Sequence, residues 1–128
     1  LWNALDCHSA TDLKALVVSP GHGIADQAKL APLVEKAAAA GDAAALTILN
    51  RSAAALAEAT AATAKELNLN PPLLSARGGA LEHLPVFHQL VKDRVIDLLP
   101  GSRWHSASGD ACDGALACAL DRSGLRPR

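Results

Sequence analysis

The feature that most constrains the fold is an amphipathic pattern between Ala43 and Leu67. Small and apolar residues recur there at alternating steps of three and four: Leu46, Leu49, Ala53, Leu56, Thr60, Thr63 and Leu67. This spacing is typical of one buried face of an α-helix. A helix of about 25 residues spans about 40 Å and is longer than most helices of globular proteins. The rest of the fold must be built around it.

Composition favours helices over sheets in the remainder of the chain. Half of the 128 residues are hydrophobic, and among the aromatic residues there are two Trp, one Phe and no Tyr. Alanine and leucine dominate, which favours helices that pack through small side chains over a β-sandwich. The 12 basic and 13 acidic residues are spread along the chain and give a net charge of −1, with no basic stripe. We therefore expect no nucleic-acid partner.

The cysteines and the hydropathy of the sequence indicate in which cellular compartment the protein is expected. Cys7, Cys112 and Cys118 match neither a zinc-site spacing nor a disulfide framework, which favours a reducing cytoplasm. We expect Cys112 and Cys118 to be small core residues of the last helix. No run approaches the roughly 18 apolar residues that a bilayer crossing needs, so we expect no membrane partner. The chain has no methionine and begins at Leu1, which predicts a processed product or a piece of a longer protein.

Local signals divide the N-terminal part into helices. Ser9 or Thr11 is expected to cap a helix over residues 12–17, and the segment 19–23 to break the structure. A helical pattern then runs over residues 24–40, in which Pro32 lies either near the start of a turn or at a kink.

A glycine and an aspartate separate that pattern from the long helix. Gly41 suits a helix C-terminus, and Asp42 can accept from a free N–H in the next helix.

The second half predicts two strands joined by a crossover helix. Strands are expected at Leu73–Arg77 and Arg103–Ala107, with a helix over Pro85–Leu98 between them. The crossover makes the strands a parallel pair. We expect this helix to bury Val86, Leu90, Val95 and Leu98 or their close neighbours, and a last helix to follow the turn at Gly109.

Two adjacent glycines stand at the corner after the first strand. Gly78 and Gly79 lie in "SARGGALEHLPVF". Such a pair allows positive φ and lets a ligand or another backbone come close, and it is also what an ordinary tight turn requires.

Three motifs, in order, resemble the C-terminal part of the BadF/BadG/BcrA/BcrD ATPase family, which includes N-acetylglucosamine and glucosamine kinases. They are "GDAAALTIL", "LLSARGGALEHLPVF" and "GDACDGALACAL", and together they span most of the chain. The resemblance implies an α/β, mostly helical fold. Residues 1–128 would be the C-terminal portion of an actin-like (ribonuclease H-like) ATPase domain, with two short parallel strands and a long helix.

The same resemblance implies a nucleotide site. Gly78 and Gly79 would lie flat beside the adenine or ribose, and Gly114 and Ala115 would keep the last helix close to the nucleotide. Arg77 stands where a small residue is usual, so it either touches phosphate or marks a degraded site. The sequence differs from the family's motifs at two further positions: His83 stands in place of asparagine, and Ala111 in place of proline. Asp110 would cap the last helix.

Catalytic machinery for phosphoryl transfer is missing from this chain. The reaction needs a phosphate-cradling loop, a magnesium-holding carboxylate and a base, and no Asp-x-Gly-(Thr/Ser) loop occurs in the sequence. The resemblance implies that a protein with an upstream half would bind ATP and Mg²⁺. Its phosphate acceptor would be an amino sugar or another small molecule. A homodimer is a further possibility, because a fragment exposes apolar surface. The alternatives are a non-catalytic helical interaction module and a degenerate remnant.

Other chemistry-bearing residues favour structural roles. His83, His88 and His105 offer three imidazoles for zinc, but surface histidines are expected at such spacings. Adjacent residues rarely face each other, which disfavours Cys7 and His8 as a nucleophile and base.

Two aspartates in the last motif are also open to two interpretations. Asp110 and Asp113 could hold magnesium, and a capping role for at least one of them is favoured.

Overall fold

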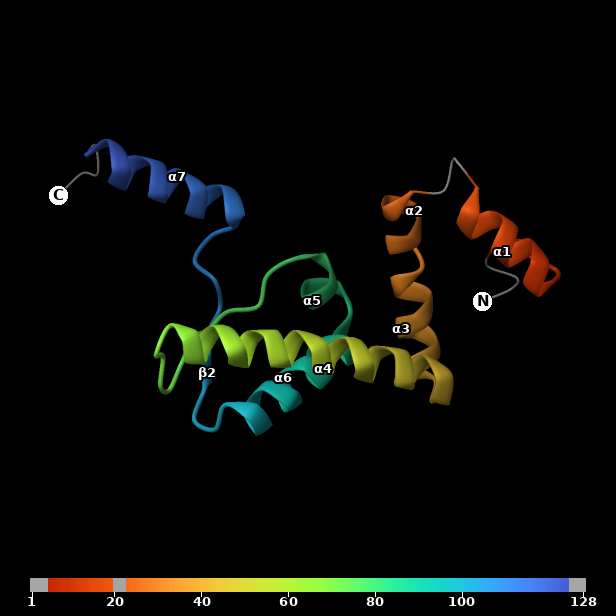
Figure 1. The fold of residues 1–128 in the computed structure, drawn as a ribbon, viewed down its shortest axis with the longest axis horizontal. Coiled ribbons are helices and arrows are strands. Elements are labelled where there is room, and N and C mark those ends of the chain that lie inside the picture. The colour runs from red at the N-terminus through yellow and green to blue at the C-terminus, as the bar shows by residue number, and fades with distance from the viewer. Residues whose placement is uncertain (1–4, 20–22, 125–128) are drawn as a thin grey trace.

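A computed structural model of the chain describes residues 5–19 and 23–124 (Figure 1). In chain order the elements are α1 (Ala10–Val18), α2 (Ile24–Ala28), α3 (Ala31–Ala39), α4 (Ala43–Glu66), β1 (Leu73–Leu74), α5 (Gly79–His83), α6 (Pro85–Leu98), β2 (Arg103–Trp104) and α7 (Ala111–Ser123). The predicted mostly helical fold with two short parallel strands is confirmed. Most of the break expected over residues 19–23 lies outside the described residues.

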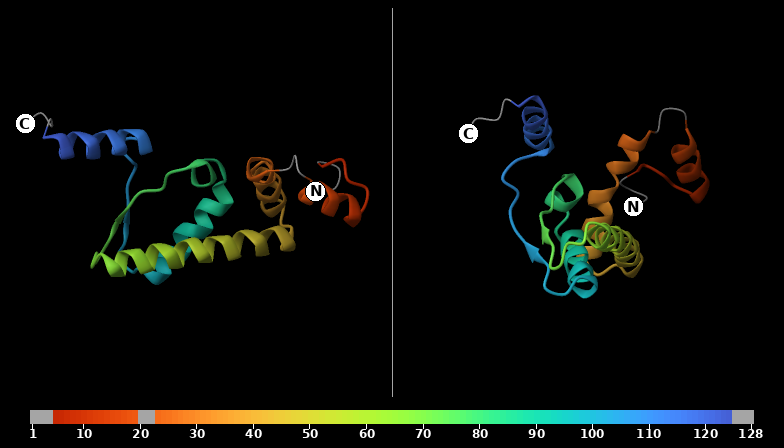
Figure 2. Two further views of the ribbon diagram at one scale, coloured as in Figure 1. Left: turned by 45° about the horizontal axis from the view of Figure 1, so that its top comes forward. Right: turned by 60° about the vertical axis from the view of Figure 1, so that its left-hand side comes forward.

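The hydrophobic core lies between α3, α4 and α6. Figures 1 and 2 show α6 crossing α4 obliquely, with α3 against the N-terminal end of α4. The buried core residues are Ala38, Ala45, Leu49, Ala53, Ala57, Leu84, Phe87, Val91 and Val95. Alanines on α3 and α4 therefore face the larger side chains of α6 and of Leu84, just before it.

The long helix α4 forms where predicted, but its buried face differs from the predicted one. Its buried residues are Ala45, Leu49, Ala53, Ala57 and Ala64. Leu56 is 37% exposed and Leu67 is 62% exposed, so the prediction that both lie on the buried face is wrong. Thr63 is also exposed. The first four buried residues are spaced by four and three of them are alanines, so this ridge lets a second helix approach closely.

The helix α6 has the predicted bounds. Val95 is buried as predicted, and the other two buried residues are close neighbours of predicted ones. Phe87, Val91 and Val95 are buried. Leu98 is 47% exposed, contrary to the prediction. Val86 and Leu90 are only partly buried and pack against the core.

The first turn of α6 is capped by a side chain from another helix. Leu84 precedes α6 and offers no side-chain acceptor. The carboxylate of Glu35, on α3, is buried and accepts hydrogen bonds from the backbone N–H groups of Val86 and Phe87. Pro85 has no N–H to satisfy, so this one carboxylate accepts from the remaining unpaired N–H groups at the start of the helix.

The N-terminal helices follow their predicted caps. Ser9 Oγ accepts from Asp12 N at 3.1 Å at the start of α1. The pattern over residues 24–40 divides into α2 and α3, and Pro32 lies in the first turn of α3. Pro32 therefore lies near the start of a helical turn, the first of its two interpretations, while the helical pattern expected through residue 40 is interrupted by a turn at Lys29 and Leu30.

The boundary between α3 and α4 also follows the sequence. Gly41 has φ of +86°, and Asp42 Oδ1 accepts from Ala45 N at 2.8 Å.

The two strands are shorter than predicted. Leu73 pairs with Arg103 and Leu74 with Trp104, in parallel. Arg103 N donates to Pro72 O and His105 N to Leu74 O, each at 3.0 Å. The predicted strands extend to residues 77 and 107. Pairing ends after two residues because the segment after each strand turns away toward the next helix.

The helices at the two ends of the chain stand away from the core in Figures 1 and 2. No residue of α1 is buried, and none is buried among residues 112–124. Cys112 and Cys118 are exposed, so the prediction that they are core residues is wrong. The last helix has no neighbour in the described chain that could cover an apolar face.

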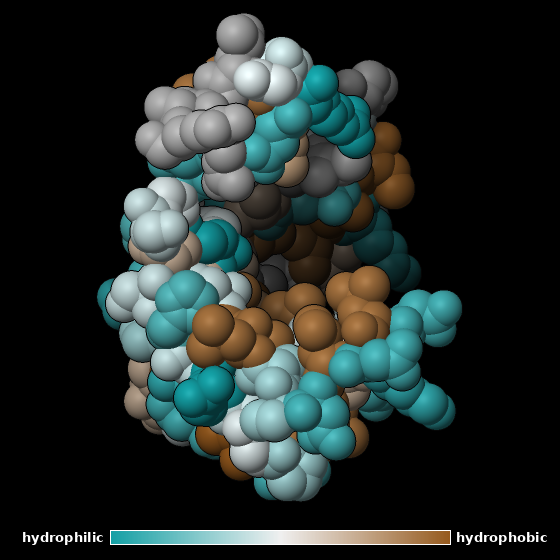
Figure 3. All heavy atoms as spheres, turned by 90° about the vertical axis from the view of Figure 1, so that its left-hand side faces the viewer, coloured by the Kyte–Doolittle hydropathy of each residue, from teal (hydrophilic) through white to brown (hydrophobic). Residues whose placement is uncertain are grey.

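Large apolar side chains gather at one end of the molecule. Figure 3 shows apolar atoms around a hollow on the face at the α7 end. Leu67 and Leu69 follow α4 there, and a groove of about 580 Å³ is lined by Leu69, Pro72, Leu98 and Leu99 among others. Within the described ranges, no helix combines the length and apolar character that a membrane crossing requires.

Candidate functional site

The glycine-bearing loops both follow the carboxyl ends of the parallel strands. The chain after β1 leads through Arg77 and Gly78 into α5, and the chain after β2 leads through Gly109 and Asp110 into α7. In open α/β folds, ligands bind outside the carboxyl ends of parallel strands. These two loops are therefore the candidate site.

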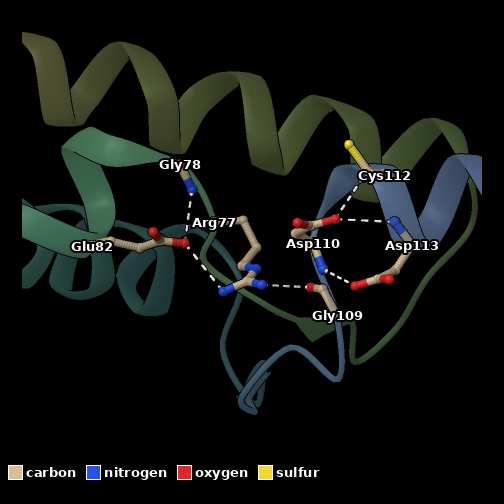
Figure 4. Close-up of polar contacts among 7 residues, drawn as sticks. All are labelled: Arg77, Gly78, Glu82, Gly109, Asp110, Cys112 and Asp113. Atoms are coloured by element: carbon tan, nitrogen blue, oxygen red, sulfur yellow. Dashed lines mark hydrogen bonds and ion pairs between the residues drawn. The ribbon is translucent and has the colours of Figure 1, made fainter.

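Arg77 holds the two loops together (Figure 4). Its Nη2 donates to Gly109 O at 2.7 Å, and its Nη1 donates to Glu82 Oε1 at 3.2 Å. The same Glu82 oxygen accepts from Gly78 N at 3.2 Å. The arginine side chain is 48% exposed. Since a guanidinium has five N–H donors, these two bonds leave others available.

The glycine pair combines one backbone requirement with open space. Gly78 has φ of +102°, a conformation that residues with a Cβ rarely adopt. A Cβ at Gly78 or Gly79 would meet nothing within 4 Å. The corner therefore needs glycine at position 78 for its backbone, and the space in front of both residues is empty.

The second loop forms a capping box at the start of α7. Asp110 Oδ1 accepts from Cys112 N at 2.7 Å and from Asp113 N at 3.0 Å. Asp113 Oδ2 accepts in return from Asp110 N at 2.8 Å. The favoured capping interpretation of these aspartates is thus confirmed. A Cβ at Gly109 would lie 2.6 Å from Asp113 Oδ2, so only glycine leaves room for this side chain.

These contacts lower the pKa of Asp110. The largest cause is the hydrogen bond from the Asp113 backbone, followed by the bond from the Cys112 backbone, and the positive charge of Arg77 adds to them. Each stabilises the carboxylate relative to the neutral acid.

Gly114 and Ala115 lie further along α7, and both are exposed. A Cβ at Gly114 would meet nothing within 4 Å. The two loops are linked by Arg77 and Gly109, while Gly114 and Ala115 stand on the helix beyond the link. Their predicted proximity to a nucleotide stays a prediction.

The residues of the alternative catalytic and metal sites are not gathered into such sites in the part of the chain that the structure describes. Among the described residues, no group of three His, Cys, Asp or Glu side chains could hold a metal ion. Cys7 is buried and its thiol donates to Leu5 O at 3.5 Å. His8 is exposed and its Nε2 lies 3.9 Å from Asp6 Oδ1. The cysteine and the histidine therefore have different surroundings.

Sequence reasoning missed two residues of these contacts. Glu82 binds both Arg77 and Gly78, and its position four residues after a glycine at a helix start was the available signal. Gly109 is predicted only to make a turn. The Asp113 side chain also requires that residue 109 has no Cβ, and no sequence pattern marks this requirement.

Comparisons with protein-family models, curated proteins and solved structures found no match to this chain.

Proposed function

We propose that this chain forms one wall of an ATP cleft in a sugar kinase or related ATPase of the BadF/BadG/BcrA/BcrD type. The observation that carries the proposal is the pair of glycine loops at the carboxyl ends of two parallel strands, joined by the Arg77–Gly109 hydrogen bond of 2.7 Å. Empty space in front of the glycines supports it, because a nucleotide needs close approach to backbone.

Each residue has a role in this proposal. Gly78 and Gly79 border the adenine or ribose, and Gly114 and Ala115 line the cleft from α7. Arg77 keeps its two protein contacts and offers its remaining N–H donors to a phosphate. The amino-sugar acceptor and the Mg²⁺ bind to an upstream part of a longer polypeptide, which also supplies the phosphate loop and the catalytic carboxylate.

The test is a titration of ATP with Mg²⁺ into this chain joined to its upstream sequence. Gly79→Val should weaken ATP binding tenfold or more, equivalent to about 1.4 kcal/mol. The fold should tolerate this valine, because a Cβ at Gly79 meets nothing within 4 Å.

Gly101→Val is the matched control. Gly101 lies in the turn before β2 and has φ of +83°. Valine there should cost about 1 kcal/mol or more of stability without changing nucleotide affinity. Absence of ATP binding in the joined protein, or equal losses of affinity in both variants, would overturn the proposal.

A second candidate is a non-catalytic helical interaction module or a remnant of the ATPase. The exposed apolar side chains of Ile48, Leu56, Leu67 and Leu69, on or after α4, favour a protein partner. Nucleotide binding separates the two functions, because the interaction module would bind no ATP even when the upstream sequence is present.

A further inference from the structure

A second hollow lies at the carboxyl ends of the strands, on the side of α6. It has a volume of about 300 Å³ and is lined by Ala76, His88, Lys92, Trp104, His105 and Ser106. This volume is at the lower end of the range of small-molecule sites, about 300 to 1,000 Å³. The loop after β1, the helix α6 and the end of β2 each contribute residues to it.

The hollow is organised around the indole of Trp104. Lys92 Nζ lies 5.8 Å from the centroid of the indole ring, within the range of a cation–π interaction. The ring of His88 lies 6.3 Å from the same indole, centroid to centroid, at an interplanar angle of 48°. His88 and Lys92 are four residues apart on α6 and so share one face of the helix.

In the described part of the chain, no acidic side chain forms an ion pair with Lys92. The ion pairs found in the described part of the chain join His8 to Asp6, Lys29 to Asp26 and Arg77 to Glu82. Lys92 is half-buried and belongs to none of them. His88 and His105 make no side-chain hydrogen bond to any described residue. A half-buried lysine lines one hollow with two histidines, and no carboxylate is among the lining residues. An anion would complete this arrangement.

The polar tip of Trp104 does not explain its position. Its Nε1–H is buried and has no acceptor among the described residues. The indole packs against the hydrophobic core, has His88 and Lys92 as neighbours, and forms part of the wall of the hollow.

We propose that this hollow binds a small phosphomonoester. The ammonium of Lys92, the imidazole N–H groups of His88 and His105 and the hydroxyl of Ser106 donate to the phosphate oxygens. The short organic group lies against the indole and Ala76. Several donors around one site suit a phosphate, which has more acceptor oxygens than a carboxylate. The site uses none of the glycine-loop residues and does not rest on the ATP proposal.

Trp104 provides the readout of the test. The chain has two tryptophans, so a Trp2→Phe background leaves Trp104 as the only one. Phenyl phosphate and inorganic phosphate are titrated into this protein without ATP or Mg²⁺, and the fluorescence of Trp104 is followed. We expect a saturable change with phenyl phosphate, and a weaker one with inorganic phosphate.

Variants assign the binding to the hollow. Lys92→Met should weaken phenyl phosphate binding tenfold or more, and Lys92→Arg should restore most of it. Lys36→Met, at an exposed lysine of α3, should leave it unchanged. Gly79→Val should also leave it unchanged, which separates this site from the proposed ATP cleft.

Three outcomes would overturn the proposal. The first is no saturable change with either probe at millimolar concentration in a chain that shows its full helical circular dichroism. The second is an equal loss of affinity in Lys92→Met and Lys36→Met. The third is benzoate binding as tightly as phenyl phosphate, which would assign the hollow to carboxylates or to anions in general.

Discussion

The carboxylate of Glu35 is buried, and its hydrogen-bond donors belong to a helix 51 residues further along the chain. Glu35→Ala leaves the N–H groups of Val86 and Phe87 without their acceptor. We expect the free energy of unfolding to fall by about 1–3 kcal/mol, the cost of leaving such groups unsatisfied. Chemical denaturation with urea measures it.

Two further variants control for the loss of charge and of side-chain volume. Glu35→Gln keeps one acceptor oxygen and should lose less stability than Glu35→Ala. Glu58→Ala, at an exposed position on α4, should change stability by less than about 0.5 kcal/mol. An equal effect at both glutamates would show that the cap contributes nothing.

Asp110 should titrate below the ordinary range of an aspartate. The backbone N–H of Asp113, then that of Cys112, and the charge of Arg77 lower its pKa. Because the pKa in the folded chain lies below that of the unfolded chain, the carboxylate stabilises the fold at any pH above the unfolded pKa. This contribution is lost as the pH falls through the folded pKa.

An NMR titration of the Asp110 carboxyl carbon checks the direction of the shift. Arg77→Met should move the midpoint upward, toward the ordinary value. Arg51→Met, which removes an exposed charge on α4, should not move it. A midpoint at the ordinary aspartate value in the unmodified chain would contradict the capping box.

At the scale of elements, the seam between α4 and α6 depends on small side chains. Ala53 is fully buried, with no exposed surface. Ala53→Leu should overpack the seam and cost about 1–3 kcal/mol. Thermal unfolding of this variant is compared with that of Ala59→Leu, on the exposed side of the same helix. An unchanged melting temperature for Ala53→Leu would mean that the seam does not form.

The elements were more predictable than their faces. The bounds of α6 and nearly those of α4 follow from periodicity, from Asp42 as a cap and from prolines. The buried face of α4 did not follow, because alanine gives little hydropathy contrast. Because Leu56 and Leu67 are larger and more hydrophobic, the prediction placed them on the buried face in place of Ala57 and Ala64.

Long-range contacts were the other limit on prediction. The cap from Glu35 to α6 and the bond from Arg77 to Gly109 join residues far apart in sequence. No local pattern marks such partners. At the candidate site, the glycine corner and the Asp110 cap could be predicted, but the arginine that joins them could be placed only from the fold.

At the scale of the whole molecule, uncovered apolar surface should cause self-association. Leu67 is 62% exposed and Leu73 is 59% exposed, and the two-stranded sheet has no further strand beside it in the described chain. Sedimentation velocity should show dimers or larger species that grow with concentration. A double variant, Leu67→Glu with Leu69→Glu, should shift the distribution toward the monomer.

A different result would favour the interaction-module interpretation. A monodisperse monomer that unfolds cooperatively would show that the chain is stable without another segment to cover these side chains.

The Glu35 cap also couples the hydrogen bonding at the start of α6 to the packing of α3 on the core. When α3 detaches from the core, the carboxylate leaves, and the amides of Val86 and Phe87 become free to exchange their hydrogens with solvent. Their exchange rates therefore report the opening of the α3 contact together with any fraying of the first turn of α6. In Glu35→Ala these two amides should exchange quickly, while the amides of the buried Val91 and Val95 stay protected.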